Sequence, residues 1–206
     1  MAQDTANLNI DGTELFSDCL AQATLVVKQV LPTHLTNATP DAEWDVRDLT
    51  GHMLALLESV PRVLSGSATA VAEDLHDEDL LETETTDLSM AWQAALDKAE
   101  AIIIDIDAED TVMHNGEQTA VENFLIEVAG DLLIHAWDLG EAIGMPVRFQ
   151  PAVAAAVLET TIVPNTVMLS SHTLFADPID PPANADFQAR LLALFGRSLA
   201  WRTAGA

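Results

Sequence analysis

Three ionisable side chains lie on helix faces that are otherwise apolar. His52 falls three residues after Leu49 and four before Leu56, in the middle of an apolar stripe. Asp131 and His135, four residues apart in a second stripe, point the same way from one helix. A buried aspartate costs several kcal/mol unless it is paired or bound to a cation. A divalent metal held by all three side chains between two helices would satisfy them together and leave coordination positions open, as in catalytic sites.

A second interpretation of the same spacing needs no metal. Asp131 and His135 would hydrogen-bond each other, and His52 would be an independent core histidine with its own partners. The pattern Asp-x-x-x-His is frequent by chance, and one facing histidine adds little to it. Spacing alone therefore leaves both interpretations open.

Three residues on the same predicted helix are candidates for the surroundings of this site. Glu127 lies one turn before Asp131 and is a candidate for a competing ligand, or for a hydrogen-bond partner of a ligand. Trp137 follows His135 by two residues and is a candidate wall for a pocket. Asp138 is a candidate partner of a ligand, and the alternative is an acid on the helix surface.

Two residues elsewhere in the chain are further candidates. His114 precedes the helix that carries Asp131 and is a candidate for the mouth of the site. Arg47 is one of few cations and is a candidate for binding a substrate carboxylate, although an ion pair with a neighbouring acid is the simpler interpretation. The other histidines are expected at the surface or its rim: His34, His76 and His172.

Composition excludes several classes of function. The chain has 206 residues, 49% of them hydrophobic, which is enough apolar side chain to bury a core. Its 33 acidic and 8 basic residues give a net charge of −25, which repels nucleic acid and anionic membrane surfaces. The single cysteine, Cys19, excludes an internal disulfide and an all-cysteine metal site.

Cellular location follows from what the sequence does not contain. The first residues have neither the positive nor the apolar region of a signal peptide, and the uncharged stretch 160–176 is too short and polar to span a bilayer. We therefore expect a soluble, cytoplasmic protein that binds neither nucleic acid nor membrane. A homodimer through an apolar helix face is compatible with the composition, and no face requires one.

Hydrophobic periodicity predicts an all-α chain with antiparallel helices and some long connections. Asp45 and Asp48 form a capping-box pattern at the start of the second helix, and Asn115-Gly116 indicates a tight turn or short hairpin within 111–119. The acidic stretch 67–87 is expected to be a solvated connection with one short helix, and 177–182 an extended linker. Six helices are expected, at residues 12–31, 45–66, 88–104, 119–143, 151–170 and 186–201.

Two segments of the chain resemble the mycothiol-dependent maleylpyruvate isomerase-like proteins. Residues 39–53, TPDAEWDVRDLTGHM, are similar to the family segment W-D-V-R-D-L-x-x-H. Residues 131–144, DLLIHAWDLGEAIG, are similar to its segment H-x-W-D-L-x-x-A-x-G, and residues 115–119 to its glycine-containing approach to that helix. Residues 185–197 resemble the ending of the short actinobacterial branch, so the resemblance covers most of the chain.

The resemblance implies a fold and a ligand set. The family belongs to the DinB/YfiT-like superfamily of four-helix bundles, whose members bind a divalent metal, often zinc, through three side chains. Matched residue by residue, the ligands fall on His52, Asp131 and His135, with zinc expected and nickel as the alternative. The isomerase has a glutamate where this chain has the shorter Asp131. We expect a metal-binding bundle at 1–150 and additional C-terminal helices at 151–206 packed on it, in place of the isomerase's C-terminal α/β domain.

The resemblance also implies a chemistry, with mycothiol as cosubstrate. A metal-bound thiol loses its proton, and the thiolate attacks an electrophilic small molecule, so that the metal-bound thiol is the nucleophile and no side chain serves as one. The expected activity is that of a mycothiol-dependent S-transferase or isomerase. The alternatives are a non-catalytic metal-binding bundle that acts as a sensor or binds a partner, and a metal-dependent hydrolase that uses bound hydroxide.

Overall fold

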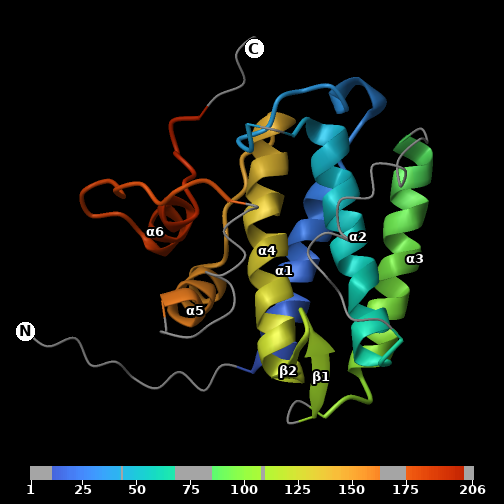
Figure 1. Ribbon diagram of the computed structural model, residues 1–206. Helices are drawn as coiled ribbons and strands as arrows, with labels where there is room; N and C mark the ends of the chain where they lie inside the picture. Colours follow the sequence, from blue (N-terminus) through green and yellow to red (C-terminus); the bar gives the residue numbers. More distant parts are fainter. Residues whose placement is uncertain (1–10, 43, 68–84, 108–109, 163–174, 202–206) are drawn as a thin grey trace, which may run out of the picture.

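The computed structural model describes residues 11–42, 44–67, 85–107, 110–162 and 175–201. Within these ranges the chain is helical apart from one short hairpin, which confirms the expected all-α class (Figure 1). No helix in this part of the chain is both long and apolar enough to cross a membrane. The elements are α1 (Gly12–Val27), the 3-10 helix η1 (Pro32–His34), α2 (Val46–Leu64), α3 (Thr85–Ile103), β1 (Thr111–His114), β2 (Glu117–Ala120), α4 (Val121–Ala142), α5 (Pro151–Ile162) and α6 (Phe187–Leu194).

Helices α1 to α4 stand side by side around one apolar core, with α5 and α6 on the flank of α4 (Figure 1). Helix α1 packs along α4, and α2 lies between α3 and α4. Helix α5 contacts α6, α1 and α4, so the C-terminal helices rest against the bundle. The largest fully buried side chains belong to the four central helices and include Phe16, Met53, Trp92 and Phe124.

Helix α4 is the most enclosed element and carries two of the three candidate ligands. Seventeen of its 22 residues are buried, so nearly every side of the helix faces protein. Polar groups on such a helix lose their contact with water and must find partners inside the molecule. The helix ends at Ala142, and Gly144 follows with a φ of 74°, as the glycine stop in the sequence predicts.

Helix α2 starts where the sequence predicts. The carboxylate of Asp45 accepts hydrogen bonds from the backbone N–H groups of Arg47 and Asp48, and Asp48 accepts one from the N–H of Asp45. This reciprocal capping box satisfies N–H groups that the first turn of a helix leaves free. It fixes the start of the helix that carries His52 nearly two turns further on.

The predicted hairpin is confirmed and lies against the bundle. Strands β1 and β2 pair antiparallel, with His114 opposite Glu117. Asn115 and Gly116 both have positive φ, 50° and 79°, which is the geometry of a type I′ turn. The pairing places His114 beside α4, because β2 leads directly into that helix.

Some predicted helix bounds were wrong. Helix α1 ends at Val27 and not at residue 31, and Lys28 caps it before Pro32 is reached. Helix α6 ends at Leu194 and not at residue 201, because Gly196 takes a φ of 74° and turns the chain. Helix α3 begins three residues earlier than expected, at Thr85. Residues 68–84, most of the acidic stretch for which a short helix was expected, lie outside the described residues. The expected end of the fifth helix, His76 and His172 also lie outside them.

Replacement of the α2 cap tests this account of the helix start. We expect Asp45→Ala to lower the free energy of unfolding by about 1 kcal/mol, because two backbone N–H groups lose their acceptor. Asp45→Asn keeps an acceptor oxygen, so it should lower the free energy of unfolding by only a few tenths of a kcal/mol. Urea unfolding measures both values. Equal losses in the two variants would contradict the capping role.

Candidate metal centre

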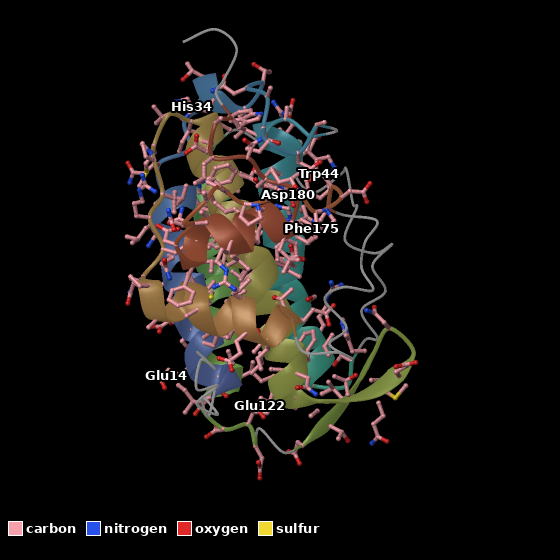
Figure 2. All side chains as sticks on the ribbon, turned by 90° about the vertical axis from the view of Figure 1, so that its left-hand side faces the viewer. Glu14, His34, Trp44, Glu122, Phe175 and Asp180 are labelled. Atoms are coloured by element: carbon pink, nitrogen blue, oxygen red, sulfur yellow. The ribbon has the colours of Figure 1, made fainter. Side chains whose placement is uncertain are left out.

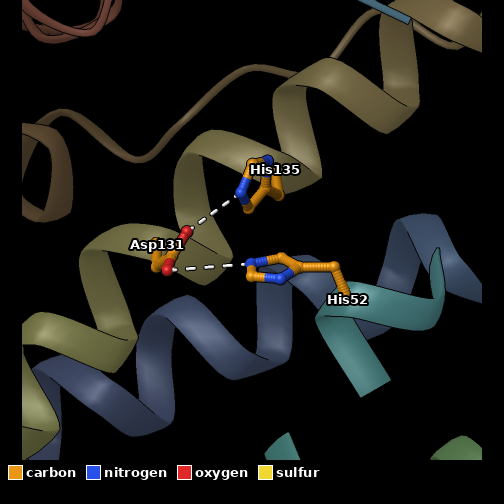
Figure 3. A group of neighbouring side chains, drawn as sticks. All are labelled: His52, Asp131 and His135. Carbon is orange, nitrogen blue, oxygen red and sulfur yellow. Dashed lines mark ion pairs between the residues drawn. The ribbon is translucent and has the colours of Figure 1, made fainter. Parts of the chain in front are cut away.

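Helices α2 and α4 bring His52, Asp131 and His135 together (Figure 3). One ligand atom from each residue lies within 4.8 Å of the other two. His135 Nε2 is 3.0 Å from Asp131 Oδ1, and His52 Nε2 is 3.9 Å from Asp131 Oδ2. Among the described residues this is the one group of three or more such side chains close enough to hold a metal ion.

The contact between His135 and Asp131 is not a good hydrogen bond. His135 Nε2 and Asp131 Oδ1 are both buried, and although they lie 3.0 Å apart, neither makes a hydrogen bond of acceptable direction within the described structure. Buried polar atoms in native proteins are nearly always satisfied. A cation between these atoms and His52 would satisfy them, and two imidazoles with one carboxylate are a donor set that suits zinc. The residues therefore fit a divalent metal.

A fully buried carboxylate orients His135 from its other side. Asp138 Oδ2 lies 3.2 Å from His135 Nδ1, so the ring donates its Nδ1 proton there and turns Nε2 towards Asp131 and His52. This is the usual arrangement around histidine ligands of metals. The structure thus places Asp138 against His135 inside the bundle, and the alternative position on the helix surface was wrong.

Two aromatic side chains lie against the histidines. The Trp44 ring centroid is 4.8 Å from that of His52 and 5.7 Å from that of His135. Phe175 stacks on His135 at 5.2 Å with an interplanar angle of 19°. Both rings are half-buried, and both lie on the same side of the molecule (Figure 2). They form an apolar cover near the surface.

Glu127 contacts a different histidine. Its Oε2 lies 3.2 Å from Nε2 of His114, which the hairpin holds against α4 and Phe124. Glu127 is therefore not one of the three grouped side chains, and it forms a pair with His114 one turn from Asp131 on the same face of α4.

The other two candidates take different positions. Trp137 is 2% exposed, and two residues turn a helix by about 200°, so it leaves α4 on the side away from His135. Arg47 lies in the first turn of α2, and the role of its side chain in substrate binding stays a prediction.

Burial and charge act in opposite directions on the ligands of the metal-free chain. Burial alone would raise the pKa of Asp131, but the adjacent His135 outweighs it and holds that pKa well below the usual range. Burial alone would lower the pKa of His135, but the carboxylates of Asp131 and Asp138 outweigh it and raise the pKa to about 9. Without metal, these residues form a buried ion pair at neutral pH.

Comparisons of the whole chain with protein-family models, curated proteins and solved structures found no match.

Sequence reasoning missed four residues around the histidines. Trp44 belongs to the same segment as His52, and the sequence analysis assigned it no role at the site. Arg197 forms ion pairs with both Asp41 and Asp138. A signal for Arg197 existed, since a cation next to a helix-ending glycine is conspicuous in a chain with only 8 basic residues. Phe175 carries no local signal, because nothing near it in the sequence resembles a site.

The charge pair gives a prediction for the metal-free protein. The raised pKa of His135 stabilises the fold fully below pH 6.5, and this contribution is lost as the pH rises through about 9. In EDTA, the free energy of unfolding of wild type should therefore fall by on the order of 3 kcal/mol between pH 6.5 and pH 10 because of this residue. His135→Gln serves as the reference because it lacks this contribution but keeps the buried Cys19 thiol. Burial raises the pKa of that thiol, so alkaline pH lowers the free energy of unfolding of both proteins by the same amount through Cys19. If the free energies of unfolding of wild type and His135→Gln changed in parallel with pH, the ion pair would be contradicted.

Proposed function

We propose that His52, Asp131 and His135 bind one divalent metal ion, with zinc preferred and nickel as the alternative. The observation that supports this most directly is the convergence of three ligand atoms within 4.8 Å from two helices, two of them 3.0 Å apart without forming a hydrogen bond. The orientation of His135 by Asp138 supports it further. The helical bundle around the centre would then be one of the DinB/YfiT-like type, as the two resembling segments imply.

We further propose that the centre serves thiol chemistry. When bound, the metal would lower the pKa of a thiol at its open position and so provide a thiolate at neutral pH. Mycothiol is the thiol that the resemblance implies. The thiol sulfur would form a bond to an electrophilic carbon, and a leaving group would depart with the bonding electron pair, which is S-transfer. In isomerisation the sulfur would add to a double bond and leave again after rotation, with no net change in atoms.

The surrounding residues have roles in this proposal. Trp44 and Phe175 keep water from one side of the histidines and offer an apolar surface to the thiol or the electrophile. His114 and Glu127, one helical turn from Asp131, are the candidates for accepting the thiol proton. Asp131 is the ligand with the most exposed side chain, 14%, so the metal is approached from its side.

Metal content tests the first step. We expect about one zinc ion per chain in protein purified without a histidine tag, measured by elemental analysis. His135→Ala and His52→Ala should lose most of the metal, because two ligands hold zinc poorly. His34→Ala is the matched control, since His34 Nδ1 accepts a hydrogen bond from the N–H of Leu31 and the residue lies outside the group of three ligands. Equal metal contents in wild type and His135→Ala would contradict the site.

Thiol binding and turnover test the second step. With Co²⁺ in place of zinc, mycothiol should produce a sulfur-to-cobalt charge-transfer absorption that His135→Ala does not show. Zinc-loaded protein should then form S-conjugates with an aryl halide, or isomerise a cis-unsaturated acid, and EDTA should abolish the activity. Metal binding without any thiol signal would instead support the non-catalytic alternative. Hydrolysis of ester substrates in the absence of thiol would support the hydrolase.

A further inference from the structure

Arg197 is a buried cation that joins three distant parts of the chain. It is 3% exposed and lies just beyond α6. Its Nη2 is 2.8 Å from Asp138 Oδ2 on α4 and 2.9 Å from Asp41 Oδ2 in the loop before α2. Its Nε also bonds both oxygens of Asp138, at 3.1 and 3.2 Å, and its Nη1 bonds the carbonyl oxygen of Phe195 at 3.0 Å.

Asp138 is thus held from two sides. Arg197 contacts it from one side, and on the other side His135 Nδ1 lies 3.2 Å from Asp138 Oδ2. A guanidinium that contacts both oxygens of a carboxylate fixes its plane as well as its charge. Arg197 is therefore linked through Asp138 to the orientation of the His135 ring, and with it to the direction in which Nε2 points.

The turn after α6 aims Arg197 at this position. The N–H of Gly196 bonds the carbonyl of Ala193 at 3.1 Å, and the N–H of Arg197 bonds that of Leu192 at 2.8 Å. Together with the φ of 74° at Gly196, these two bonds form a Schellman motif. A Cβ at Gly196 would lie 2.7 Å from both the Cβ of Ala176 and the carbonyl oxygen of Asp177, so the turn also packs closely on the segment after Phe175.

The same segment supplies the aromatic cover. The guanidinium carbon of Arg197 lies 5.1 Å from the Phe175 ring centroid, and Phe175 stacks on His135. Phe195 packs edge-on against Phe175 at 4.7 Å. Residues 175–197 therefore contact His135 both through Asp138 and through Phe175.

We propose that Arg197 is a positioning residue for the metal centre, and that metal binding and the docking of the segment 186–197 stabilise each other. The proposal rests on the metal centre put forward above. Its physical basis is that a preoriented ligand loses less freedom when a metal binds, and that coupling between two binding events is reciprocal. Arg197 itself touches neither the metal position nor the substrate side.

The first test is zinc affinity, measured by competition with a chromophoric chelator. We expect Arg197→Met to weaken zinc binding by about 10- to 100-fold, the effect usual for partners of metal ligands. Arg190→Met removes an exposed arginine from the same segment and should leave the affinity unchanged. Arg197→Lys keeps the positive charge but not the guanidinium that bonds both oxygens of Asp138, so its zinc affinity should lie between those of wild type and Arg197→Met.

A double-mutant cycle separates positioning from general damage to the fold. If Arg197 acts through Asp138, then adding Arg197→Met to Asp138→Asn should change zinc affinity by no more than about twofold. Asp138→Asn keeps the shape of the side chain, and by itself it tests the pathway if Arg197→Met does not fold. Full additivity of the two losses would overturn the proposal.

Hydrogen exchange tests the reciprocal direction. Zinc should slow exchange of the backbone amides in 187–197 of wild type, and it should do so much less in Asp138→Asn. Zinc bound equally tightly by wild type and Arg197→Met would overturn the positioning role while leaving the metal centre intact. No zinc bound by wild type would overturn the metal centre itself, and the inference with it.

Discussion

A helix that is buried on nearly every side cannot carry charge unless other parts of the molecule compensate it, and this constraint organises the structure. Helix α4 holds Asp131, His135 and Asp138 within eight residues, in a region where most neighbours are apolar. Each of these groups has a partner from elsewhere on α4 or in the chain, because ionised groups in the interior are stable only when paired. Their partners from outside α4 are His52 of α2 and Arg197 after α6. Arg197 in turn also pairs with Asp41 in the loop before α2.

The formal charges around the three grouped side chains do not cancel. Asp41, Asp131 and Asp138 contribute three negative charges, while Arg197 and the protonated His135 contribute two positive ones. One negative charge is left over. A divalent ion that replaced the proton of His135 would bring the total to zero. With a net charge of −25, the whole chain also attracts cations to its surface, so its electrostatics favour metal entry at low salt.

How much the sequence could predict depended on how local each signal was. The α2 cap and the Asn115-Gly116 turn were predictable because each depends on residues within four positions of one another. The three grouped side chains were recognisable as polar interruptions of apolar stripes, and the Asp131–His135 spacing placed two of them on one face. That His52 faces them needed the packing of α2 on α4, which periodicity alone does not provide.

The residues behind the ligands could not have been predicted in this way. Arg197 reaches Asp138 across 59 positions and Asp41 across 156, and no spacing rule connects residues so far apart. The end of α6 was misjudged for a related reason. Apolar residues continue past Leu194, but the positive φ of Gly196 turns the chain and directs Arg197 inward.

The Gly196 turn has an evolutionary consequence. Any side chain at this position would push against Ala176 and Asp177, and the neighbour of Ala176 is the ring that stacks on His135. A mutation at a residue with no functional group would thus alter the aromatic cover and leave His52, Asp131 and His135 in place. Divergence of the site among descendants of such a protein would therefore arise at glycine and alanine positions of the C-terminal segment, where a comparison restricted to chemically active side chains would not find it.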